Sequence, residues 1–131
     1  SLVMFHYTVE SNRSIEETVQ ALEAALAEER FGILWQLDIK DTLRNKGFDY
    51  ARDYMVLEVC NPHIAHQVLS KNHMVGYFLP CKLVVYQDDG KVKVGMPKPS
   101  VLMSLVEDER LTEIALDVEK RLKKCMDKAV E

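Results

Sequence analysis

Two short apolar-rich segments joined by a tight turn place the strongest constraint on the fold of this chain. The segments are residues 82–87 and 91–96, and Asp88-Asp89-Gly90 separates them. Asp-Gly is a preferred pair for the two-residue turn of a β-hairpin, because both of its residues accept a positive φ. The segments therefore predict two strands that pair antiparallel.

Three further strands are predicted upstream. In residues 3–9, Phe5, Tyr7 and Val9 alternate with polar side chains, and residues 31–39 alternate in a similar way. Residues 53–60 are apolar on both faces, which favours a central position in the sheet.

Capping residues indicate where helices begin. Ser14 and Glu17 have the spacing of a capping box, in which each side chain accepts a hydrogen bond from a backbone amide. Asn61-Pro62 is a second start, because Asn is a favoured N-cap and proline suits the first helical position. Ser100 is expected to cap a short helix. Helices are thus predicted over residues 15–29 and 41–46, after Asn61, after Ser100, and over residues 108–128.

The order of the main elements is β-α-β-β-α-β-β-α. Strands joined by hairpins, with helices covering one face, are typical of an α+β fold. We therefore expect a mostly antiparallel five-stranded sheet with helices on one face. A length of 131 residues is enough to bury a core, and we expect a single α+β domain over residues 4–129.

Charge and cysteine content exclude several classes of protein. A formal net charge of −4 gives no basic surface for nucleic acid or anionic lipid. No apolar run reaches the ~18–20 residues of a membrane span, and the N-terminus lacks the order of a signal peptide. Three irregularly spaced cysteines indicate reduced thiols and a cytoplasmic location. We expect neither a nucleic-acid nor a membrane partner.

Five segments together resemble the bacterial family known as domain of unknown function 302. They are FHYTV, RFGILWQLD, LEVCNP, VGYFLPCKLVVY and GMPKP. The resemblance extends from Met4 to about Ala129. It implies a compact α+β domain that forms dimers. It implies no established reaction and no cofactor, so any cofactor stays unknown.

Cys60 and Cys81 are the candidate reactive thiols. Cys60 precedes the Asn61 helix start, where a helix N-terminus lowers the pKa of a thiol, and Lys82 brings positive charge beside Cys81. Alternatively, both thiols pack as small hydrophobic groups. They become neighbours only if the third and fourth strands run antiparallel, and the strand order that the resemblance implies favours separation.

Glu58 is the one carboxylate inside an apolar strand. Burial would make it a candidate general base, and the alternative is an ion pair with Arg52 or Lys82. His63 and His66 share a helix face opposite its apolar stripe. They supply only two of the ligands that a zinc site needs, so we assign no metal site within the chain. A metal between two copies of the chain stays an alternative.

These patterns favour a homodimeric binding module with a pocket near the end of the third strand. Trp35, Tyr86 and the stiff segment 96–99 are candidates for the walls of a pocket. Two alternatives remain, a thiol-dependent enzyme or redox protein with Cys60 as nucleophile, and a structural interaction module. The ligand, and whether any reaction occurs, stay open. The residues expected to bind a small-molecule ligand are Glu58, Cys60, Asn61, Cys81 and Lys82.

Overall fold

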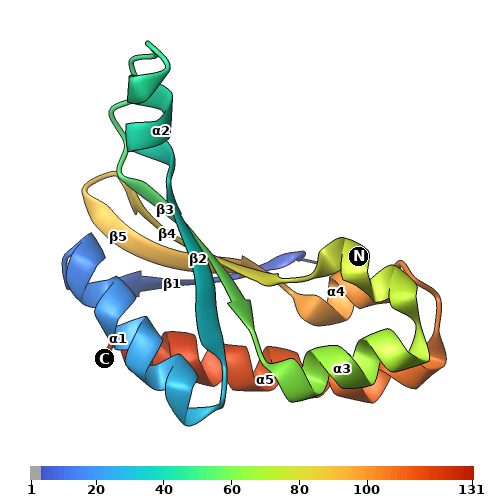
Figure 1. The fold of residues 1–131 in the computed structure, drawn as a ribbon. Helices are drawn as coiled ribbons and strands as arrows, with labels where there is room; N and C mark the ends of the chain where they lie inside the picture. Colours follow the sequence, from blue (N-terminus) through green and yellow to red (C-terminus); the bar gives the residue numbers. More distant parts are fainter. Residues whose placement is uncertain (1–3) are drawn as a thin grey trace.

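The computed structural model describes residues 4–131 and contains a five-stranded antiparallel sheet in the order β1-β5-β4-β3-β2 (Figure 1). The strands are β1 (His6–Ser11), β2 (Gly32–Asp38), β3 (Tyr54–Cys60), β4 (Cys81–Asp88) and β5 (Lys91–Pro97). The α-helices are α1 (Ile15–Glu28), α2 (Ile39–Asn45), α3 (Pro62–Lys71), α4 (Pro99–Ser104) and α5 (Thr112–Ala129). Two 3-10 helices, η1 (His73–Phe78) and η2 (Glu109–Leu111), complete the structure. The predicted α+β class is confirmed.

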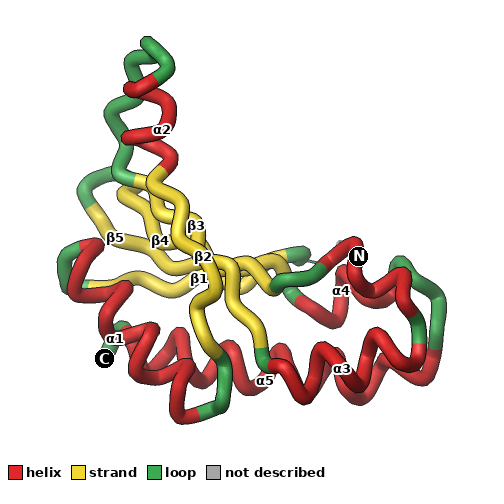
Figure 2. Tube along the Cα trace, in the orientation of Figure 1, coloured by secondary structure: helices red, strands yellow, loops and turns green. Residues whose placement is uncertain are grey.

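Helices α1 and α5 cover one face of the sheet, and α2 projects from the sheet at the far end of β2 (Figures 1 and 2). Alternate residues of the strands point to the two helices and form the main hydrophobic core with them. Leu22 and Leu26 of α1 and Leu122 of α5 are fully or almost fully buried there. The strand residues of this core are Leu57, Val59, Leu83, Val85, Val92, Val94 and Met96.

The other face of the sheet carries the alternate set of side chains. Glu58 and Lys82 follow and precede the core residues Leu57 and Leu83, so they point away from α1 and α5. A second, smaller core lies beyond the end of the sheet and joins α3, η1, α4, η2 and α5. It consists of Val68, Val75, Met103, Leu111 and Ala115.

The predicted local signals are confirmed at three places. Ser14 and Glu17 form both hydrogen bonds of the capping box, each 3.1 Å long. Asn61 Oδ1 accepts a 3.2 Å hydrogen bond from the Ile64 amide at the start of α3. In the β4–β5 hairpin, Asp89 and Gly90 have φ angles of 51° and 76°, as a turn of this type requires.

The prediction that Ser100 caps a helix is wrong. Helix α4 begins at Pro99, after Lys98, because proline suits the first helical position. Ser100 instead lies inside α4, where its amide and hydroxyl donate to Glu119 Oε1 at 3.1 and 2.6 Å. Glu119, on α5, thereby ties the first turn of α4 to the main helical layer.

Two predicted boundaries also differ from the structure. β1 begins at His6 and continues to Ser11, because it pairs with β5 as far as Ser11 opposite Val92. Val3, the predicted start, lies outside the described residues. Asp108 does not begin the last helix. Its carboxylate accepts from the Arg110 amide and caps η2, and α5 starts at Thr112.

Candidate functional site

A cavity of about 500 Å³ opens where β3 ends and β4 begins. This volume falls in the range of ~300–1,000 Å³ that is typical of small-molecule sites. Its walls come from β2, β3, β4, the segment η1 with the residues after it, the end of β5, α4 and α5. The lining residues are Leu34, Trp35, Glu58, Tyr77, Phe78, Leu79, Pro80, Cys81, Lys82, Met96, Pro97, Pro99, Leu102, Met103 and Leu122.

Two proline-containing connections frame this cavity. The first leads from η1 into β4 and contains the cis Leu79–Pro80 peptide bond. The second leads from β5 into α4 and contains Pro97 and Pro99. Met96 and Met103, which also line the cavity, are buried. The cavity therefore reaches from the surface to the hydrophobic core.

Trp35, Glu58 and Lys82 form a row across three neighbouring strands at the cavity. Glu58 pairs in register with Trp35 on β2 and with Lys82 on β4. Directly opposed side chains of antiparallel strands have Cβ atoms about 4.5–5.5 Å apart, so these three side chains are neighbours. Lys82 Nζ donates to Glu58 Oε1, which confirms the predicted alternative of an ion pair for this carboxylate.

The two members of this ion pair differ in their access to solvent. The Glu58 side chain is 14% exposed, whereas the Lys82 side chain is 47% exposed. Glu58 is a fixed part of the wall, on a strand with neighbours on both sides. Lys82 reaches it from the solvent side.

The expectation that Cys60 and Cys81 are separated is wrong. β3 and β4 run antiparallel, and Cys81 pairs with Val59, one residue before Cys60. The antiparallel course follows because η1 and the residues after it lead the chain back along α3. All three cysteines of the chain are free thiols.

Cys81 lines the cavity at the end of β3, but its thiol is not activated. Burial, together with the negative charges of Cys60 and Glu58, raises the pKa of Cys81 to about 11. At neutral pH it is protonated, and a protonated thiol is a poor nucleophile. Lys82 does not offset these effects, because it is the next residue of β4 and its side chain points to the other face of the sheet, where it pairs with Glu58.

Cys60 and Asn61 do not line this cavity. They lie beneath α3, beside a space of only about 20 Å³ that Cys81 also borders. Asn61 is 4% exposed and has a structural role, because Oδ1 caps α3 and Nδ2 donates to Glu29 O at 3.3 Å. The structure therefore brings together three of the predicted site residues, Glu58, Cys81 and Lys82, and places the other two nearby.

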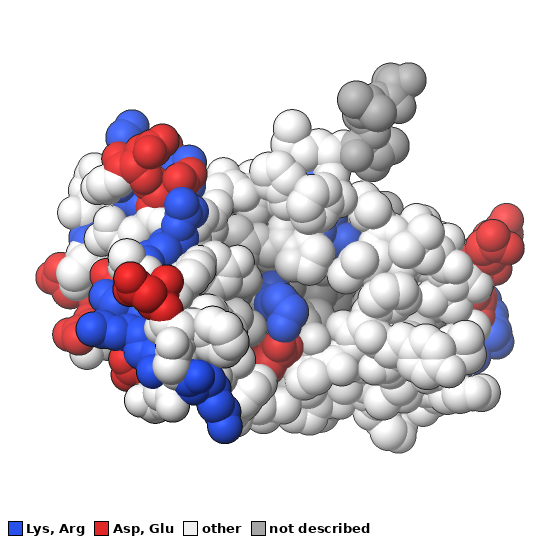
Figure 3. Space-filling view, turned by 90° about the horizontal axis from the view of Figure 1, so that it is seen from above, with Lys and Arg blue, Asp and Glu red and all other residues white. Residues whose placement is uncertain are grey.

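Large apolar side chains are exposed around the mouth of the cavity. Leu34, Trp35 and Tyr77 are 64%, 55% and 78% exposed. Figure 3 views the molecule from the side opposite α1 and α5. Charged side chains gather at one end of this view, whereas only a few charged groups interrupt the surface around the hollow near its middle. Large apolar side chains are therefore a main part of the surface on which the cavity opens.

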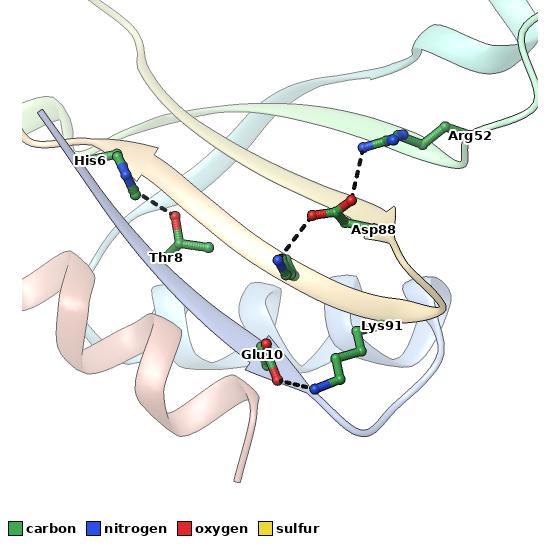
Figure 4. Close-up of polar contacts among 7 residues, drawn as sticks. His6, Thr8, Glu10, Arg52, Asp88 and Lys91 are labelled. Carbon is green, nitrogen blue, oxygen red and sulfur yellow. Dashed lines mark hydrogen bonds and ion pairs between the residues drawn. The ribbon is translucent and has the colours of Figure 1, made fainter.

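Charged side chains on the strands away from the cavity pair with one another (Figure 4). Asp88 accepts from Lys93 at 3.0 Å and from Arg52 at 3.5 Å, and Lys91 donates to Glu10 at 3.4 Å. The hydrogen bond from Lys93 and the nearby charges lower the pKa of Asp88. The charges of these side chains are therefore neutralised by one another.

His63 and His66 are both exposed on α3. Within residues 4–131, no group of three or more His, Cys, Asp or Glu side chains is placed to hold a metal ion. None of the helices in that range has the length and apolarity to cross a membrane.

Sequence reasoning missed the walls contributed by η1 and α4. Tyr77, Phe78, Leu102 and Met103 line the cavity, and none of them was singled out. A 3-10 helix leaves no clear hydrophobic period. The run GYFLP, with two aromatic residues before a proline, was the available signal. Trp35, Met96, Pro97 and Pro99 line the cavity, as anticipated. Tyr86, the other aromatic candidate, does not line it, and its ring lies against Tyr54 instead.

Comparison with known proteins supports the resemblance read from the sequence. No curated protein matches the chain. A crystal structure described as an uncharacterized conserved protein DUF302 from Bacillus stearothermophilus is 50% identical, with a TM-score of 0.95. The match covers 97% of this chain and 99% of that one. The family described as domain of unknown function DUF302 matches residues 7–129. The chain therefore belongs to the DUF302 family.

Proposed function

We propose that this protein is a binding module that holds a small, largely apolar ligand in the cavity at the end of β3. The observation that carries the proposal is the cavity itself, a space of about 500 Å³ that extends from the surface to buried Met96 and Met103. Ligand sites are typically concave and mostly apolar, with a few polar groups that fix orientation. Here the Glu58–Lys82 pair supplies the polar groups.

The same surface supports a homodimer. Leu34, Trp35 and Tyr77 leave much of their apolar area in water beside the cavity mouth. Contiguous exposed apolar area marks interaction sites in soluble proteins. A two-fold contact at this surface would shield these side chains and narrow the opening of the cavity.

A thiol-based reaction at this cavity has little chemical support. Cys81 is the thiol in its wall, and its pKa of about 11 keeps it protonated. Cys60 precedes α3 but lies outside the cavity lining. Binding therefore fits the chemistry of the cavity better than nucleophilic catalysis does.

The test is the binding of a neutral apolar fluorophore, N-phenyl-1-naphthylamine, whose emission rises in apolar surroundings. Leu102→Arg places a charge in the cavity wall and should abolish saturable binding. Leu105→Arg is the matched control, because Leu105 lies three residues further along, is 68% exposed and is outside the cavity lining. Equal binding by both variants, or no saturable binding by the wild type, would refute the proposal.

A further inference from the structure

The row formed by Trp35, Glu58 and Lys82 limits which polar group a ligand can carry at this cavity. Of the two charged members, the carboxylate is the fixed one, since the Glu58 side chain is 14% exposed and the Lys82 side chain 47%. A buried carboxylate that loses its cationic partner is costly, whereas an ammonium at the surface regains water when it is displaced. An incoming group can therefore replace Lys82 beside Glu58 more easily than it can replace Glu58.

We propose, on the basis of the function proposed above, that the ligand is an amphiphilic organic cation, whose ammonium group takes the place of the Lys82 ammonium beside Glu58. The ammonium of Lys82 marks a position where the folded protein already stabilises a positive charge. The apolar body of the ligand lies against the cavity walls formed by Met96, Leu102 and Met103.

Aromatic rings at the cavity favour the same class of ligand. Trp35 is the direct cross-strand neighbour of Glu58, and Tyr77 and Phe78 also line the cavity. The face of an aromatic ring attracts an organic cation, most strongly in the case of tryptophan. A carboxylate combined with aromatic rings is a recognition set for ammonium groups.

An anionic ligand is disfavoured at this position. Its negative charge would lie beside the negative charge of the Glu58 carboxylate. Two like charges that are close together repel each other, and this repulsion weakens binding. The raised pKa of Cys81 is consistent with this field, since burial, Cys60 and Glu58 all oppose a negative charge on that thiol. Lys82 does not provide a free cation for an anion, because Glu58 already holds it.

The experiment compares three ligands that share a ten-carbon chain and differ in the head group: decylamine, 1-decanol and decanoate, at pH 7 and below the micellar range. Decylamine is protonated at this pH, as a lysine side chain is. Trp35 is the only tryptophan of the chain and lines the cavity, so its fluorescence reports binding. The wild type should bind decylamine most tightly and decanoate most weakly.

Two variants separate the contributions of the paired charges. Lys82→Met removes the competing ammonium, so the affinity for decylamine should rise about tenfold while the affinity for 1-decanol stays within about twofold. Glu58→Gln should abolish the preference for decylamine over 1-decanol. Lys91→Met is the control for net charge, because Lys91 pairs with Glu10 away from the cavity. It should leave all three affinities within about twofold of the wild type.

Other outcomes would contradict either the inferred charge of the ligand or the proposed binding function. Tighter binding of decanoate than of decylamine would assign the site to anions and overturn the inference. Weaker binding of decylamine to Lys82→Met would show that the Lys82 ammonium does not compete with the ligand and would overturn it as well. Equal affinities for the three head groups would overturn the inference and leave the proposed apolar binding function in place. Failure of all three ligands and of the neutral fluorophore to bind would refute the proposed function itself.

Discussion

The Asn61 side chain holds the junction between β3 and α3, and its replacement by alanine should destabilise the protein by about 2 kcal/mol. Loss of an N-cap hydrogen bond costs about 1 kcal/mol, and here Oδ1 accepts from the Ile64 amide. Loss of the second hydrogen bond, from Nδ2 to Glu29 O, adds about 1 kcal/mol. Loss of the hydrogen bond to Glu29 O costs no more than this, because Glu29 O still accepts a hydrogen bond from Arg121.

The assay is urea-induced unfolding of a series at this position, with equal m-values as the condition for comparing free energies of unfolding. Asn61→Ser keeps an oxygen that can cap the helix and loses the hydrogen bond to Glu29 O, so it should cost about 1 kcal/mol. Gln67→Ala, at an exposed position of α3, is the control and should stay within about 0.5 kcal/mol of the wild type. A cost below about 0.5 kcal/mol for Asn61→Ala, or equal costs for the alanine and serine variants, would refute this reasoning.

Three further predictions concern the thiols, a buried carboxylate and the assembly. Alkylation with iodoacetamide at pH 7, followed by peptide mass mapping, should label Cys60 before Cys81 and Cys125, because burial is the main cause that raises the pKa of each of the latter two to about 11. Earlier labelling of Cys81 would contradict this order. At Glu119, burial opposes ionisation, but the hydrogen bonds from Ser100 and the ion pair with Lys123 together outweigh it and lower the pKa below its ordinary value of 4.5. The resulting stability is present above that pH and is lost as the pH falls through the lower folded-state value. Glu119→Gln should therefore be less stable at pH 7 and should lose less stability on acidification, and parallel pH profiles in thermal unfolding would argue against it. Light scattering at micromolar concentration should give twice the mass of the 131-residue chain, and Trp35→Glu should shift it toward the monomer. A wild-type monomer would reject the homodimer.

The parts of the fold that could be predicted from the sequence are those determined by residues close together in the chain. The Ser14 capping box, the Asn61 N-cap and the Asp89-Gly90 turn each depend on residues only a few positions apart. The strand alternation then assigned the core face. Each of these signals lies within a few residues, so it does not depend on how distant segments of the chain are arranged.

Features that depend on long-range packing were not predicted. The antiparallel pairing of β3 with β4, and with it the proximity of Cys60 to Cys81, depends on the return of the chain through η1. Ser100 had the composition of a cap, but its partner is Glu119 on a different helix. No sequence pattern near Ser100 indicates that Glu119 is its hydrogen-bond partner.

The candidate site was predicted in part for the same reason. Glu58 was noticed because a carboxylate is unusual in an apolar strand, and Lys82 was one of its two anticipated partners. Cys60 and Asn61 were assigned to the pocket because they stand where the predicted third strand ends and a helix begins. In the structure they lie under α3, while Tyr77 and Leu102, distant in sequence, line the cavity.

The central claim, that the cavity at the end of β3 holds an apolar ligand, is tested most directly by nuclear magnetic resonance. Amide chemical shifts of the ¹⁵N-labelled protein are followed during titration with 1-decanol. The account predicts saturable shifts that are largest at Trp35, Tyr77 and Leu102, which line the cavity from three different elements. Shifts that do not saturate, or that centre on α3 at residues such as Ala65, would contradict it.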